Sequence, residues 1–99
     1  MAKAERREQV LREAWLGDAV LGLYVREKIL REDGRVDGEK FARITSNQFL
    51  SAFGEPSGVE AEIGRRYAAE GLLGAFAWIE ANLMPLLARQ EENRRRRLQ

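Results

Sequence analysis

The spacing of apolar residues predicts helices along almost the whole chain. Residues 3–32 contain no proline, and apolar side chains cover most of the circumference of a helix drawn through them. These side chains are Val10, Leu11, Ala14, Trp15, Ala19, Leu21, Leu23, Tyr24 and Val25. A helix that is apolar on nearly all sides belongs at the centre of a domain, and Gly17 allows a bend in it. The Asp-Gly pair at residues 33–34 is typical of a helix end.

Three further helices follow from the same periodicity. A second helix is predicted over residues 38–53, with Phe41, Ile44, Phe49, Leu50 and Phe53 apolar. After the Gly-Glu-Pro-Ser-Gly stretch, Glu55 or Ser57 caps a third helix that ends near Asn82, and its apolar residues are spaced by three and four. Pro85 falls in the first turn of a last helix that ends near Glu92. The sequence therefore predicts an all-α compact bundle as one domain over residues 1–92, with a basic tail at 93–99.

Composition narrows the possible chemistry. The 99 residues include 17 basic and 16 acidic side chains, so no overall basic field points to nucleic acid. Cysteine and histidine are absent, which removes thiol chemistry, the imidazole base and the usual zinc ligands. Catalysis would rest on carboxylates and other polar groups, with a hard metal. No apolar run is long enough for a membrane span and the N-terminus is charged, so we expect a soluble, cytoplasmic protein without a membrane partner.

Two acids stand among small and apolar residues. Asp18 lies within residues 14–21, and Glu70 lies within residues 68–76. Burying an unpaired carboxylate costs several kcal/mol, so each acid needs a cation, hydrogen bonds or a raised pKa. On two packed helices they could share one magnesium or manganese ion, since these metals prefer oxygen ligands. From the pattern alone, a salt bridge to an arginine or simple exposure is the more frequent outcome.

Three stretches resemble ribonuclease III domains. Residues 16–21 read Leu-Gly-Asp-Ala-Val-Leu after an aromatic residue, which is similar to the signature helix of that family. Residues 24–26 continue as Tyr-Val-Arg, as in the Mini-III type. Residues 43–50 contain an Arg, Thr-Ser-Asn and Leu pattern similar to the second family helix, and residues 70–76 resemble the family motif Glu-Ala-Leu-Ile-Gly-Ala. The three motifs stand in the family order over roughly residues 10 to 80.

The resemblance implies a helical bundle of the ribonuclease III endonuclease-domain type. It implies magnesium-dependent hydrolysis of double-stranded or structured RNA, of the kind that processes ribosomal RNA, leaving a 5′-phosphate and a 3′-hydroxyl. Asp18 and Glu70 match two of the four acids that hold the metal in full ribonuclease III, and manganese could replace magnesium. Family members form two-fold dimers with a valley for the duplex, so a homodimer is expected.

The chain departs from the family pattern in two ways. Ala14 and Tyr67 stand where full ribonuclease III has its other two acids, and the Mini-III type shares the first of these changes and lacks an Asp at the other position. In addition, only 52 positions separate Asp18 from Glu70, and a short link replaces a helical segment of the family. The sequence therefore resembles a shortened Mini-III domain.

Arginines and exposed apolar residues are the candidates for contacts with partners. The predicted RNA-binding residues are Arg26, Arg43, Arg65, Arg66, Arg94, Arg95, Arg96 and Arg97. A-form RNA is recognised chiefly by shape and through its phosphates and 2′-hydroxyls, which suits such groups. Each of these arginines could equally be an ordinary solvated side chain, and the terminal run could be a flexible tail. The predicted dimer interface draws on Trp15, Leu16, Leu23 and Phe76.

Two other classes of protein stay open at this point. The chain could be a catalytically inactive ribonuclease III-like dimer that binds RNA or a ribosome, which the missing acids and the missing segment favour. It could also be a helical dimerisation module in which the motif arose by chance. Convergence of the Asp18 and Glu70 oxygens on one ion would argue against the third class, and a cleavage assay would separate the first two.

Overall fold

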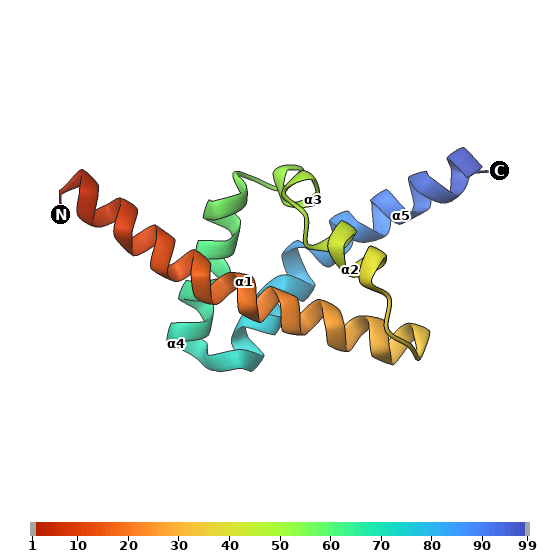
Figure 1. Ribbon diagram of the computed structural model, residues 1–99, viewed down its shortest axis with the longest axis horizontal. Coiled ribbons are helices and arrows are strands. Elements are labelled where there is room, and N and C mark those ends of the chain that lie inside the picture. Colours follow the sequence, from red (N-terminus) through yellow and green to blue (C-terminus); the bar gives the residue numbers. More distant parts are fainter. Residues whose placement is uncertain (1, 99) are drawn as a thin grey trace.

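A computed structural model describes residues 2–98 of the chain, and every regular element in that range is a helix (Figure 1). The helices are α1 (Lys3–Asp33), α2 (Gly38–Ile44), α3 (Asn47–Ser51), α4 (Pro56–Asn82) and α5 (Met84–Leu98). The predicted all-α class is confirmed.

Several predicted helix ends are confirmed, and each has a local cause. α1 ends at Gly34, which has a φ of 73°, and the Gly34 amide donates to the Leu30 carbonyl. α4 begins at Pro56, and the Glu55 side chain accepts hydrogen bonds from the amides of Ser57 and Gly58. Of the two predicted caps, Glu55 is therefore the cap. Pro85 lies in the first turn of α5, as expected.

The predicted helix over residues 38–53 is wrong, because the structure has two short helices there. The first ends at Ile44, and the Thr45 hydroxyl donates to the Phe41 carbonyl in its last turn. Ser46 then adopts an extended backbone, and its side chain accepts from the Phe49 amide. Ser46 is thus the N-cap of α3, since serine hydroxyls satisfy the free amides of a first turn.

Two further features differ from the prediction. α5 does not end near Glu92 but runs to Leu98, so the boundary drawn between residues 92 and 93 falls inside a helix. Glu92 forms ion pairs with Arg95 and Arg96 one turn later, and such contacts support a continuing helix. α4 is broken at Gly71, with φ 79° and ψ −176°. Residues other than glycine rarely adopt this backbone conformation, so the break depends on Gly71.

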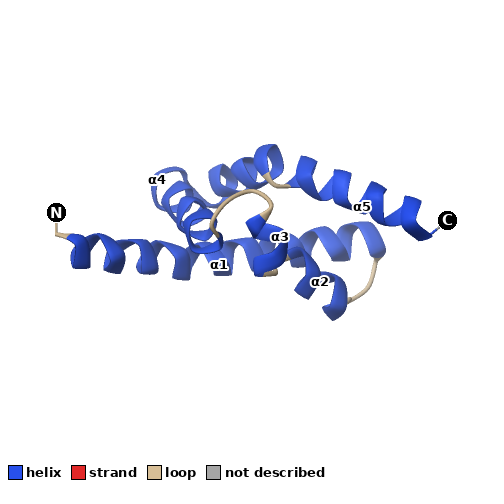
Figure 2. Cartoon of the chain, turned by 90° about the horizontal axis from the view of Figure 1, so that it is seen from above, coloured by secondary structure: helices blue, strands red, loops and turns tan. Residues whose placement is uncertain are grey.

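The core lies between α1 and the two halves of α4, with α2, α3 and α5 covering its edges. Its largest fully buried side chains are Leu21, Val25, Ile44, Leu50, Ile63, Ile79 and Leu83. The first turns of α1 and the last turns of α5 extend beyond this core at opposite ends of the molecule (Figures 1 and 2). The principal-axis extents of 52 × 24 × 22 Å reflect these two projecting ends.

Candidate active site

The helices α1 and α4 cross at two glycines, where their backbones approach each other closely. A methyl group added at Gly17 would lie 1.7 Å from the Glu60 carbonyl oxygen, and one added at Gly64 would lie 2.0 Å from the Glu13 carbonyl oxygen. Ala14 and Ala61 are the small buried neighbours on either side. The two helix backbones are therefore in direct contact, which only glycine permits at both positions.

This crossing brings Asp18 and Glu60 together. Asp18 follows Gly17 on α1, Glu60 lies one turn before Gly64 on α4, and the two carboxyl groups lie close enough to act on each other. Partial burial, the hydrogen bond to Asp18 and the negative charges of Asp18 and Glu55 raise the pKa of Glu60 to about 7. Near neutral pH, Glu60 therefore keeps a proton that it donates to the Asp18 carboxylate for much of the time.

Glu70 lies in a different environment. Its carboxylate accepts from Arg66 at 3.2 Å, and no hydrogen bond or ion pair within residues 2–98 joins it to Asp18. The expectation that both acids lie in largely buried helices is wrong, because Asp18 and residues 67–73 are exposed. The break at Gly71 interrupts the buried face of α4 at this point, so the segment before it faces solvent.

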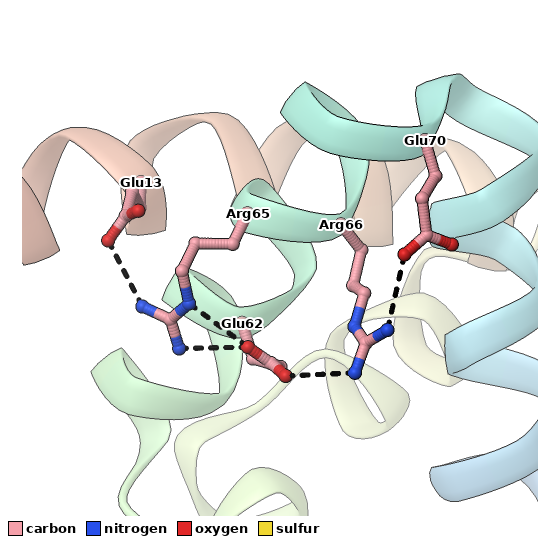
Figure 3. Close-up of polar contacts among 5 residues, drawn as sticks. All are labelled: Glu13, Glu62, Arg65, Arg66 and Glu70. Carbon is pink, nitrogen blue, oxygen red and sulfur yellow. Dashed lines mark hydrogen bonds and ion pairs between the residues drawn. The ribbon is translucent and has the colours of Figure 1, made fainter.

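Figure 3 shows that Glu70 is the last member of a row of ion pairs along the surface. Arg65 contacts Glu13 of α1 at 3.1 Å and Glu62 at 2.9 Å, and Arg66 contacts Glu62 at 3.4 Å. Burial lowers the pKa of Arg65, but the hydrogen bonds that Arg65 donates to Glu62 and Glu13, with the charges of these carboxylates, outweigh this effect and raise the pKa. Arg65 and Arg66, which we predicted to bind RNA, are therefore engaged within the chain.

The other predicted RNA-binding arginines divide into two groups. Most have partners in the chain: Arg26 lies over the Phe41 ring with 4.0 Å to its centroid, Arg43 pairs with Glu91 at 3.0 Å, and Arg95 and Arg96 pair with Glu92. Arg94 and Arg97 form no ion pair with any part of the chain that the structure describes. The guanidinium groups of these two arginines are therefore available to bind an anion from outside the chain.

Three of the four predicted interface residues are exposed. Trp15 is 81% exposed, and Leu16 and Leu23 are each 40% exposed or more. Phe76 packs instead against Tyr24 of the same chain, with ring centroids 5.2 Å apart and an interplanar angle of 77°. Tyr24 also donates a hydrogen bond to Glu80, so this aromatic contact joins α1 to the second half of α4.

Glu60 is the candidate site residue that the sequence analysis missed, although a signal was present. Residues 60–64 read Glu-Ala-Glu-Ile-Gly, which fits the family pattern Glu-Ala-Leu-Ile-Gly with one change. In this alignment the position three residues before the glutamate holds Ser57 instead of Tyr67, so the third acid is absent in either case. The separation from Asp18 falls to 42 positions (60 minus 18), which makes the shortening of the middle segment larger.

The donor set at Asp18 and Glu60 fits magnesium. Within residues 2–98 no group of three or more acidic, histidine or cysteine side chains is placed to hold a metal ion. Magnesium does not need such a group, because it keeps several waters and is commonly bound through one or two carboxylates and substrate phosphates. Asp18 is exposed, so water and a phosphate can reach this carboxylate pair.

Comparison of the chain with protein-family models, curated proteins and solved structures finds no match in any of the three. In the range 2–98 no single helix is long and apolar enough to cross a membrane. The helices α4 and α5 are bent by 42° relative to each other. Only the two together are long and apolar enough to span a membrane, by length and composition alone.

Proposed function

We propose that the chain is a magnesium-dependent endoribonuclease of the Mini-III type that cleaves double-stranded or structured RNA, with Asp18 and Glu60 as the metal-holding carboxylates. One observation carries the proposal. The acid of the Leu-Gly-Asp motif contacts a glutamate in a Glu-Ala-x-Ile-Gly context, across a helix crossing that two glycines make possible. Glu60 thus takes the role that the sequence alone assigned to Glu70.

The surroundings of the pair suit this role. Asp18 and Glu60 repel each other when both are ionised, and a divalent cation between them removes that cost. When bound, magnesium supplies Lewis-acid chemistry, which activates water and neutralises charge on the phosphate and the leaving oxygen. Contact between the two backbones at Gly17 and Gly64 keeps the segments that carry Asp18 and Glu60 next to each other.

A second candidate is a ribonuclease III-like dimer that binds RNA without cutting it. The absence of a third acid near Asp18 within residues 2–98 favours this alternative. Both candidates share the fold and the RNA ligand, and they differ only in whether the phosphodiester bond is broken.

Incubation with long duplex RNA tests the proposal. The protein should cut the RNA with magnesium and leave it intact with a chelator. Asp18→Asn should lose cleavage while its circular dichroism stays helical. Asp37→Asn is the matched control, because asparagine caps α2 as well as the native Asp37, whose side chain accepts from the Lys40 amide.

The outcomes separate the two candidates. Duplex RNA that is bound but never cut would favour the non-cleaving dimer. Cleavage retained by folded Asp18→Asn protein would overturn the assignment of the site.

A further inference from the structure

A pocket of about 490 Å³ lies on the side of the molecule where α5 passes α2 and α3. Figures 1 and 2 show the last turns of α5 leading away from this region. The polar side chains around the pocket include Arg43, Gln48, Gln90, Asn93, Arg94 and Arg97. Arginine and amide groups provide several hydrogen-bond donors, so the pocket suits an anion with several oxygen atoms.

The helical repeat of α5 divides its four consecutive arginines into two pairs. Arg94 and Arg97 are three residues apart and line the pocket with Gln90. Arg95 and Arg96 lie outside the pocket lining and pair with Glu92. The two pairs have the same charge and lie on the same exposed helix, but only the first is directed at the pocket and lacks ion pairs within residues 2–98.

The pocket already holds an internal anion beside its third arginine. The Glu91 carboxylate contacts Arg43 at 3.0 Å, and both residues line the pocket. Both side chains are more than a third exposed, so this ion pair contributes little to stability. A phosphate group can therefore replace the carboxylate at Arg43 with a small cost and gain bidentate contacts from the guanidinium group.

We propose that this pocket binds a backbone phosphate of duplex RNA through Arg94, Arg97 and Arg43, with Glu91 as a competing internal anion. RNA as the ligand rests on the proposed function, whereas the site itself does not depend on cleavage. Contacts of this kind position a duplex without reading its sequence. The pocket adds a phosphate contact that lies apart from Asp18 and Glu60, toward the C-terminal end of α5.

The matched pairs of arginines provide the test. Affinity of the full chain for a 20-base-pair RNA duplex is measured with a chelator present, between 50 and 200 mM salt. Arg94→Gln with Arg97→Gln should weaken binding about 10-fold and lower the salt slope by about 1, because the contact with one backbone phosphate is lost. Arg95→Gln with Arg96→Gln removes the same charge from the same helix and should change affinity less than about 3-fold.

Two additional measurements sharpen the result. Glu91→Gln should raise affinity for the duplex, since it frees Arg43. Equal losses in the two double variants, or no binding by the native chain at 50 mM salt, would overturn the proposal. The proposal would also be overturned if Arg94→Gln with Arg97→Gln lost binding of inorganic phosphate but kept its affinity for the duplex, because the pocket would then bind a small anion. Failure of cleavage alone would leave these binding results unchanged, so the two proposals fail separately.

Discussion

The carboxyl groups of Asp18 and Glu60 repel each other when both are ionised, so their contact costs stability at high pH. The pKa of Glu60 is about 7 in the folded chain against an ordinary value of 4.5. The folded state therefore holds this proton more tightly than the unfolded chain. The contribution of Glu60 is fully present below about pH 4.5 and is lost as the pH rises through about 7.

Glu60→Gln mimics the protonated side chain at every pH and should remove this loss. Without metal, the variant should be more stable than the native chain at pH 8, by about 1 kcal/mol once the shift is discounted for solvent screening. The difference should vanish at pH 4. Urea unfolding with a chelator at the two pH values measures it. A variant with the same advantage, or none, at both pH values would contradict the raised pKa of Glu60.

At this scale the sequence singled out Asp18 with Glu70, whereas the structure places Glu60 beside Asp18. Asp18 is recognisable because its Leu-Gly-Asp context is specific. The segments starting at Glu60 and Glu70 both resemble the same motif, and each has a glutamate followed by small and apolar residues. Which of them meets α1 depends on where the two helices touch. The point of contact between the helices depends on Gly17 and Gly64 together, and two residues so far apart in the sequence form no local pattern that could predict it.

At the scale of helices, the crossing of α1 and α4 leaves no room for a larger side chain at either glycine. Gly17→Ala and Gly64→Ala each place a methyl group within about 2 Å of a backbone carbonyl oxygen, which cannot rotate away as a side chain can. Either change should therefore destabilise the chain by about 3 kcal/mol or more, at the upper end of overpacking effects. Thermal or urea unfolding gives the magnitude.

Gly38→Ala is the control for these two substitutions. Gly38 is the first residue of α2, and an added methyl group there meets nothing within 4 Å. Since alanine favours a helix more than glycine does, this variant should be as stable as the native chain or slightly more stable. Similar losses for Gly38→Ala and Gly17→Ala would mean that the close approach is not what stabilises the crossing.

The boundaries of helices were predictable where a single residue sets them. The Asp33-Gly34 pair ends α1, and Glu55 before Pro56 begins α4, because caps act within one turn. The break at Ser46 was missed because the apolar spacing continues across it, while the serine cap forms only when the chain turns. The break at Gly71 was missed because a glycine inside a helical pattern can be accommodated without a break.

At the scale of the whole molecule, several large apolar side chains on α1 are not covered by any part of residues 2–98. Trp15, Leu16 and Leu23 are exposed on the helix that forms the centre of the fold. The core is small because the chain is short, and burying this surface against a second copy would add to it. We expect a homodimer at micromolar concentrations in sedimentation velocity, and Trp15→Ser should shift it toward monomer.

Val36→Ser serves as the control for the dimer. Val36 is 85% exposed and lies in the turn between α1 and α2, outside the α1 surface. The change removes a comparable exposed apolar side chain, and the dimer should persist. A native chain that sediments as a monomer across this concentration range would rule out the dimer. Equal effects of the two serine substitutions would rule out the α1 surface as its interface.

The choice between Glu60 and Glu70 tests the central claim most directly. The rate of cleavage of long duplex RNA in magnesium should be compared for Glu60→Gln and Glu70→Gln, two identical changes on one helix. Glu60→Gln should lower the rate by about 100-fold or more. Mutating residues that only hydrogen-bond to a metal ligand already lowers metal affinity or activity by about 10- to 100-fold, and a ligand itself should count for at least as much. Glu70→Gln loses only an exposed contact with Arg66 and should keep most of the rate. The reverse order, with Glu70→Gln inactive and Glu60→Gln active, would contradict the assignment of Asp18 and Glu60 as the site.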